Sequence, residues 1–278
     1  MNSDEKRVLS RHAYEIRKGA LTAIQSAKSG HLGGSFSIAD ILSVLYFKQM
    51  NIDIENPKKS DRDRLVLSKG HCSPALYSTL ALRGFFPTEH LTTFRTLDSD
   101  LSGHAEFHVP GVDMSSGSLG QGLSVALGMA MSAECKGDKY RVFCIMGDGE
   151  IQEGQVWEAA MAAGHFKADN LIAFVDNNNL QIDGPVDSVM SPYPIAEKFK
   201  AFGWNTIEID GGNVEEINAA IDAASDNKGK PTVIVAKTIK GKGVSVFENQ
   251  VRFHGGCPTD EEFETAFNEL NEKIKELA

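Results

Sequence analysis

Apolar residues in the first part of the chain recur with the period of an α-helix. From Val8 to Lys28 they form a single stripe, and Gly30 lies just beyond it, which predicts an amphipathic helix that stops there. Ser37 and Asp40 resemble a capping box, which predicts that a second helix begins at Ser37 and continues to Met50. Further helical patterns span residues 73–82, 119–133, 153–165, 195–202, 214–224 and 260–277.

Short, continuous apolar runs alternate with the later helices. They predict five strands, at residues 64–68, 141–146, 171–176, 204–209 and 232–238. Because such strands are buried on both faces, we expect an α/β fold with a doubly wound, mostly parallel sheet and helices on both faces. We expect residues 1–278 to form one domain, with a helical N-terminal portion, about residues 1–63, packed on it. Ligands of such sheets bind beyond the carboxyl ends of the strands.

Composition narrows the class of protein. The chain of 278 residues is 41% hydrophobic and 24% charged, which is ordinary globular composition and argues against disorder. A net charge of −10 makes nucleic acid an unexpected partner. The four cysteines lie far apart, without a C-x-x-C pair, which disfavours structural zinc and disulfides. We find neither a signal peptide nor a run suited to a membrane span, and we expect a cytoplasmic protein without membrane contact.

Oxygen ligands for a metal follow two neighbouring predicted strands. Gly147-Asp148-Gly149-Glu150 follows the strand at 141–146, and Asn178 lies 30 positions after Asp148 in an asparagine run. A carboxylate and an amide oxygen at adjacent strand ends suit Mg²⁺ or Ca²⁺, and the glycines let the backbone approach a phosphate. Such residues are also common in turns, but the strand context and the spacing favour a metal–phosphate site.

Four of the eight histidines lie in predicted loops beside glycines: His31, His71, His104 and His254. Histidine titrates near neutrality, so a cluster beside a sugar hydroxyl and a diphosphate could orient groups and transfer protons. An isolated histidine is more often structural or superficial, and no compact spacing indicates a histidine metal site. We interpret His165 as structural, at a helix end, and assign no function to His12, His90 and His108.

The residues that follow the second and third predicted strands resemble the thiamine diphosphate motif. The wider segments 147–159 and 176–184 specifically resemble transketolase, and the resemblance extends along nearly the whole chain. It covers only the diphosphate-binding domain of a full-length transketolase. Leu32-Gly33-Gly34 and Gly103-His104-Ala105-Glu106 lack prolines common in long transketolases, and in this they resemble two-chain transketolases and 1-deoxyxylulose phosphate synthases.

The resemblance implies a role for each matching residue. Asp148, Asn178 and the carbonyl of Leu180 would hold Mg²⁺, with Ca²⁺ or Mn²⁺ as substitutes, and the metal would clamp thiamine diphosphate. His31, His71, His104 and His254 would line the thiazolium and the reacting end of the sugar. The implied cofactor contacts are His71, Gly117, Ser118, Leu119, Gly147, Asp148, Gly149, Glu150, Asn178 and His254.

Two further segments have both an ordinary and a functional interpretation. Glu153 and Glu158 suit the first turns of a helix through the macrodipole, and by the resemblance they belong to a carboxylate network that links paired active sites and is catalytic. The basic segment from Lys237 to Gly243 suits a solvated loop, or a flap over the diphosphate with glycine hinges.

The implied reaction is transfer of a two-carbon ketol unit from a ketose phosphate to an aldose phosphate. The pyrimidine-binding domain of the family is missing, so we expect one subunit of a split transketolase, active with a separate C-terminal subunit in an α2β2 assembly, within the pentose phosphate pathway or another carbohydrate route. The alternatives are the α subunit of a 2-oxoacid dehydrogenase, a 1-deoxyxylulose phosphate synthase fragment, and a non-catalytic diphosphate-binding subunit. The donor and acceptor sugars stay open.

Overall fold

A five-stranded parallel sheet forms the centre of the computed structural model, which describes residues 1–278. The strands lie in the order β1-β2-β3-β7-β6, and every neighbouring pair is parallel. Their bounds are Arg64–Leu67 (β1), Val142–Gly147 (β2), Leu171–Asn177 (β3), Asn205–Asp210 (β6) and Thr232–Lys237 (β7). The five predicted strands and the α/β fold class are therefore confirmed.

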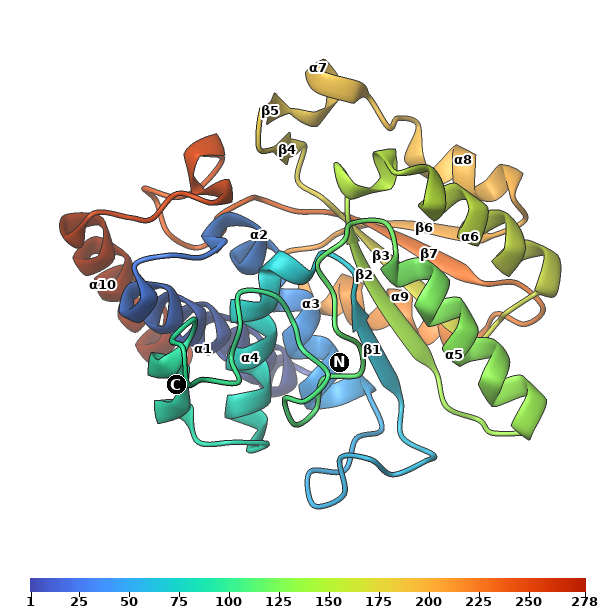
Figure 1. Cartoon of the computed structure of the whole chain (residues 1–278), viewed down its shortest axis with the longest axis horizontal. Helices are drawn as coiled ribbons and strands as arrows, with labels where there is room; N and C mark the ends of the chain where they lie inside the picture. Colours follow the sequence, from blue (N-terminus) through green and yellow to red (C-terminus); the bar gives the residue numbers. More distant parts are fainter.

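Helices cover both faces of this sheet (Figure 1). Helices α1, α3, α4 and α9 share a core with one face, and α5, α6 and α8 share a core with the other. The helices span Ser3–Ala27 (α1), Leu32–Ser37 (α2), Ala39–Val44 (α3), Ser73–Arg83 (α4), Gly122–Lys136 (α5), Gly154–Phe166 (α6), Val186–Met190 (α7), Ile195–Ala201 (α8), Val214–Asp226 (α9) and Asp260–Glu276 (α10).

Alternate residues of the central strands contribute to the two cores. Phe143 and Ile145 of β2 pack with the helices of the first face, whereas Val142 and Cys144 pack with α5 and α6. Successive side chains of a strand point to opposite faces, so a strand that is covered on both sides must be apolar throughout. This double burial explains the continuous apolar runs of the sequence.

The first helix begins earlier than its apolar stripe. The side chain of Asn2 accepts a hydrogen bond from the Glu5 N–H (2.8 Å), and the Asn2 N–H donates to the Glu5 carboxylate (2.9 Å). This capping box satisfies two N–H groups of the first turn, so α1 starts at Ser3 and not near Val8. A third core joins α1 to α2 and α10.

The prediction that a helix begins at Ser37 is wrong. The chain is already helical from Leu32, and Ser37 is the last residue of α2. After a break at Ile38 the helix resumes as α3 and ends in a π-helical turn, Leu45–Gln49. The Ser37 hydroxyl contacts the Asp176 carboxylate at 2.7 Å instead of capping a helix. The role of Ser37 is thus determined by a contact with a residue 139 positions away, although the local pattern predicted that Ser37 caps a helix.

Residues 180–190 form an excursion that the sequence pattern did not predict. Two short strands, Leu180–Gln181 (β4) and Gly184–Pro185 (β5), pair antiparallel, and α7 follows them. The excursion projects from the main sheet, at the top of the view in Figure 1. Four 3₁₀ turns complete the structure, at Gly70–Cys72, Thr88–Thr93, Glu150–Gln152 and Val251–His254.

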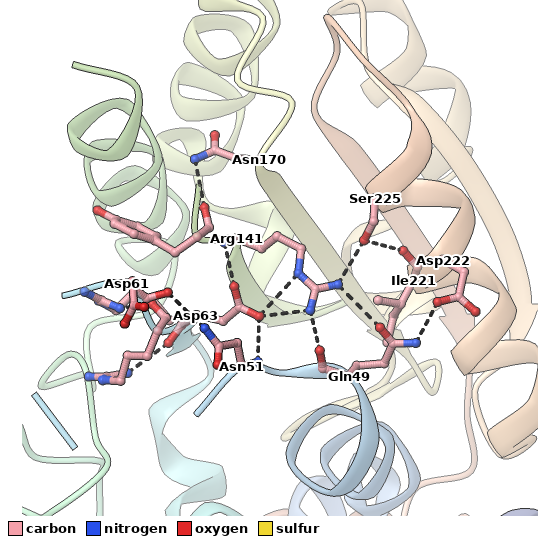
Figure 2. Close-up of polar contacts among 12 residues, drawn as sticks. Gln49, Asn51, Asp61, Asp63, Arg141, Asn170, Ile221, Asp222 and Ser225 are labelled. Atoms are coloured by element: carbon pink, nitrogen blue, oxygen red, sulfur yellow. Dashed lines mark hydrogen bonds and ion pairs between the residues drawn. The ribbon is translucent and has the colours of Figure 1, made fainter. Parts of the chain in front are cut away.

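Arg141, which directly precedes β2, joins three parts of the chain at the amino edge of the sheet (Figure 2). Its guanidinium donates to the Asp63 carboxylate (2.9 Å), to the Ser225 hydroxyl (3.0 Å) and to the backbone of Gln49. The network thereby ties the N-terminal portion to β2 and α9. No helix is both long and apolar enough to cross a membrane.

Candidate active site

A cavity of ≈ 210 Å³ lies at the carboxyl edge of the sheet. The segments that follow β1, β2 and β3 line it, together with the loop that follows β7. Its lining residues include Gly34, Lys69, His71, Leu119, Gly147, Asp148, Gly149, Glu150, Glu153, Asn178, Leu180, Lys240 and His254. The structure therefore brings most of the predicted cofactor and metal residues into one cavity.

Asp148 is the acidic group of the predicted metal site. It is 2% exposed and accepts hydrogen bonds from the backbone N–H groups of Gly149 (2.8 Å) and Asn179. Burial, reinforced by the negative charge of Asp176, raises the pKa of Asp148 to about 6. A buried carboxylate that is costly to ionise gains most from a bound cation.

Asn178 and Leu180 add neutral oxygens beside this carboxylate. The Asn178 side-chain oxygen accepts from the Leu180 N–H (3.0 Å), while its amide nitrogen donates to Asp176 (3.0 Å), which sets the orientation of the amide. The Leu180 carbonyl accepts from the Lys240 ammonium (2.7 Å). No group of three or more His, Cys, Asp or Glu residues in the chain could hold a metal ion, so a metal here would depend on neutral oxygens as well as on Asp148. One carboxylate with two neutral oxygens fits Mg²⁺, which keeps positions for water and phosphate.

The four predicted histidines converge on one side of the cavity. The ring centroid of His31 lies 4.9 Å from that of His71, 5.7 Å from that of His254 and 6.2 Å from that of His104. His71 and His254 stack with centroids 5.3 Å apart. The cluster draws on four separate segments of the chain, so only the fold brings these residues together.

These histidines are held in their neutral form. Burial, followed by the charge of Arg95, lowers the pKa of His31 to about 4, and burial, followed by the charge of Lys240, lowers the pKa of His254 to about 3. Burial also lowers the pKa of His71 and His104. Neutral imidazoles can both donate and accept hydrogen bonds, and Nδ1 of His31 is buried without a protein partner. The cluster is therefore equipped to bind hydroxyl groups, both as hydrogen-bond donor and as acceptor.

The glycine-rich loop before α5 lies against the histidines. A Cβ atom on Gly117 would lie 3.6 Å from the ring of His104, and Leu119 lines the cavity. Ser118 is exposed and does not line the cavity. Gly120 has φ +83°, a left-handed conformation that a helix cannot contain, so α5 starts at Gly122 and not at Leu119 as predicted.

Glu150 lies at the cavity wall, but its carboxylate is hydrogen-bonded within the protein. It accepts hydrogen bonds from the backbone N–H groups of Gly120 (2.9 Å) and Gly147 (3.0 Å) and from the Ser68 hydroxyl. A carboxylate also repels an anionic diphosphate. The Glu150 carboxylate therefore joins Ser68, Gly147 and the loop of Gly120, and its expected contact with the cofactor stays a prediction.

Comparison with known proteins distinguishes among the interpretations of this cavity. The family described as "Transketolase, thiamine diphosphate binding domain" matches residues 8–273. The chain belongs to the transketolase family. Its membership confirms the resemblance seen in the sequence and identifies a thiamine diphosphate-binding domain.

Relatives in this family occur both as split and as longer chains. The protein is 42% identical to one of the subunits of the apulose-4-phosphate transketolase of Phocaeicola vulgatus, over 94% of this chain and 93% of that one. It is 44% identical to a 6-deoxy-6-sulfo-D-fructose transketolase subunit of a Clostridium species, over 98% and 99% of the two chains. The transketolase structure of Campylobacter jejuni superimposes with a TM-score of 0.91 at 36% identity, covering 98% of this chain and 43% of that one. The extent of the chain matches a transketolase subunit of the two-chain form.

Glu153 and Glu158, expected in the carboxylate network of transketolase, and His165, interpreted as structural, lie at the start of α6 and along it. Glu153 precedes the first turn at the cavity rim, whereas Glu158 and His165 are exposed further along the helix. Neither glutamate has a side-chain hydrogen bond or ion pair within the chain. The carboxylate network was expected to link two copies of the chain. The role of Glu153 and Glu158 in such a network therefore stays a prediction.

Sequence reasoning missed two lysines of the transketolase cavity. Lys69 is 2% exposed and pairs with Asp176, and Lys240 is 2% exposed and contacts Nδ1 of His254 at 2.9 Å. Burial and the charge of Lys69 lower the pKa of Lys240 to about 8. The segment 237–243 is thus not a solvated basic loop. Only the positions of the two lysines in the sequence could have identified them, because both follow strand ends at the edge of the sheet where ligands bind.

Proposed function

We propose that this chain is the diphosphate-binding subunit of a Mg²⁺-dependent, two-chain transketolase that transfers a two-carbon ketol unit from a ketose phosphate to an aldose phosphate. The observation that carries the proposal is the convergence of four neutral histidines on the cavity that contains Asp148, Asn178 and Leu180. The donor and acceptor sugars are not assigned; two relatives are named for apulose 4-phosphate and for 6-deoxy-6-sulfo-D-fructose.

Each group of residues has a distinct task in this proposal. Asp148, Asn178 and the Leu180 carbonyl would hold Mg²⁺, and the ammonium of Lys240 would offset part of the charge of the diphosphate, because Lys69 is already paired with Asp176. Thiamine diphosphate, when bound, supplies the electron sink that allows a carbon–carbon bond beside a carbonyl to break and form. The histidine cluster binds the hydroxyl groups of the sugar and holds or moves protons at its imidazole nitrogens. The resemblance to transketolase supports the roles of the metal ligands and the histidines, and the position of Lys240 in the cavity supports its role.

A second chain is part of the proposal. The cavity contains only two cations, Lys69 and Lys240, and they adjoin the metal site, so groups that grip the sugar phosphate must come from elsewhere. The relatives that match this chain end to end are named as transketolase subunits, which implies such a partner. We propose that the partner carries the pyrimidine-binding domain and that the two chains form an α2β2 complex in the cytoplasm.

Exposed apolar side chains support contacts with other chains. Val125, Met161 and Phe166 are exposed on the neighbouring helices α5 and α6, and Ile182 and Met190 are 66% and 64% exposed on the excursion beside the cavity. Contiguous apolar patches on a folded chain commonly mark interaction surfaces. We propose that these residues contribute to contacts with a second copy and with the partner chain.

The test is to purify the chain alone and together with the product of the neighbouring gene. We expect ketol transfer between a ketose phosphate and an aldose phosphate only from the complex. Full activity of the isolated chain would overturn the two-chain proposal. Oxidation of pyruvate with an artificial electron acceptor would favour a 2-oxoacid dehydrogenase, and a complex that binds thiamine diphosphate but turns over no ketose phosphate would favour a non-catalytic subunit.

A further inference from the structure

Arg95 lies at the end of the histidine cluster that is remote from the metal site, and its backbone conformation is unusual. It has φ +59°, in the left-handed region that residues other than glycine rarely adopt. Its N–H donates to the Leu101 carbonyl (2.8 Å), which closes the loop that leads from Arg95 to His104. A residue held in such a conformation by its surroundings points to a side chain whose direction matters.

The Arg95 guanidinium lies between two histidine-bearing loops. Its Nη1 donates to the hydroxyl of Ser29, two residues before His31. On the other side it packs on Gly103, directly before His104, so closely that a Cβ atom there would lie 2.5 Å from Nε and 2.6 Å from Nη2. The guanidinium also lies 5.4 Å from the ring centroid of Phe94, which is fully buried.

We propose that Arg95 is a positioning residue, whose guanidinium joins the loop of Ser29 to the loop of Gly103 and so fixes the spacing of His31 and His104. The proposal rests on the proposed transketolase function, because that function gives the two histidines their task. The two ring centroids are 6.2 Å apart. A sugar hydroxyl held between two imidazoles requires them at a defined separation, and a displacement of about 1 Å can cost a reaction about 100-fold.

The charge of Arg95 acts on the same two histidines. Next to burial, it is the strongest influence that lowers the pKa of His31 and His104, and it is not among the charges that act on His71 and His254. The other charged or titratable groups that face the pair are Lys240 and His104 for His31, Glu106 for His104, and the neighbouring rings of His71 and His254. His31 and His104 therefore report on Arg95 directly, whereas the charge of Arg95 reaches His71 and His254 only through His31.

The test is a proton NMR titration of the imidazole groups in the full chain, which needs neither cofactor nor partner. In Arg95→Met, the titration midpoints of His31 and His104 should rise toward the ordinary value near 6.5, with smaller changes at His71 and His254, which are coupled to His31. Arg95→Lys keeps the positive charge but loses the planar guanidinium that reaches both loops. The titration midpoints of His31 and His104 should then stay low, while the nuclear Overhauser contact between their rings weakens. Arg83→Met is the matched control, because Arg83 also lies over a phenylalanine, Phe47, but far from the cluster.

The second readout is kinetic and uses the reconstituted complex. Arg95→Met and Arg95→Lys should lower kcat/KM by about 10- to 100-fold, with thiamine diphosphate affinity and Arg83→Met at wild-type values. Unchanged midpoints and an unchanged ring contact in Arg95→Met would overturn the proposal, as would equal changes at all four histidines. A complex that is inactive even with the wild-type chain would contradict the proposed function, while the titration would still decide the role of Arg95.

Discussion

Lys69 and Asp176 form an ion pair in the interior, with side chains that are 3% and 0% exposed. Asp176 also accepts hydrogen bonds from Ser37 (2.7 Å), from Thr238 and from the amide of Asn178 (3.0 Å). Burial alone would raise the pKa of Asp176, but the charge of Lys69 and these hydrogen bonds outweigh it and lower the pKa. The pair therefore links the ends of β1, β3 and β7 and orients a predicted metal ligand.

Lys69→Met should destabilise the chain by about 3–5 kcal/mol, because it leaves the Asp176 carboxylate buried without a counter-charge. The measurement is the free energy of unfolding in urea. Lys28→Met is the control: its partner is Asp260, and the two side chains are 59% and 88% exposed, so the loss should not exceed about 1 kcal/mol. Lys69→Met/Asp176→Asn should recover part of the stability. A loss for Lys69→Met as small as that for Lys28→Met would contradict this account.

The contrast between Asp148 and Lys69 shows how far the sequence could predict the site. Asp148 stands in a glycine turn directly after an apolar strand, so pattern and position agreed on its role. Lys69 follows a strand equally closely, but its burial depends on α2, whose Gly34 carbonyl accepts from the lysine at 3.1 Å. The strands themselves were predictable because burial on both faces makes them uniformly apolar. The β4–β5 pair was not, since strands of two residues leave no periodic pattern.

Asp148→Ala should weaken Mg²⁺-dependent binding of thiamine diphosphate by at least about 100-fold, because it removes the only carboxylate of the proposed metal site. Calorimetric titration of the chain and of its complex with the partner measures this. Stability should fall by no more than about 1 kcal/mol, because the metal-free carboxyl is itself costly to bury. The control is Asp183→Ala, an exposed aspartate between β4 and β5. Wild-type affinity in Asp148→Ala would exclude the metal site.

His254 should make the stability of the chain depend on pH. Its pKa is about 3 when folded and near 6.5 when unfolded, so between these values the unfolded chain binds a proton that the native chain does not. Stability is therefore full above about pH 6.5 and declines as the pH falls toward 3. Allowing for partial exposure, His254 should contribute a loss of about 1 kcal/mol between pH 7 and pH 5.

The comparison that isolates this contribution uses His254→Asn, whose side-chain oxygen can replace Nδ1 as acceptor for Lys240. Urea unfolding at pH 7 and at pH 5 should show a smaller decline for this variant than for the wild type. His165→Asn, which removes an exposed histidine at the end of α6, should decline as the wild type does. Parallel declines for His254→Asn and the wild type would show that His254 does not resist protonation in the fold.

Gly164 marks a close approach between α6 and the segment after α8. A Cβ atom at this position would lie 1.8 Å from the carbonyl oxygen of Phe202, and the nearby indole of Trp204 donates to the Ala160 carbonyl at 2.8 Å. Gly164→Ala should therefore lower the free energy of unfolding by about 2–3 kcal/mol, since the backbone of residue 202 must move. Gly154→Ala, at the start of the same helix, meets no atom within 4 Å and should stabilise the chain by about 0.4–1 kcal/mol. Changes of opposite sign in the free energy of unfolding of the two variants would identify the close approach at Gly164 as the cause of the destabilisation. Equal changes in the two variants would rule this cause out.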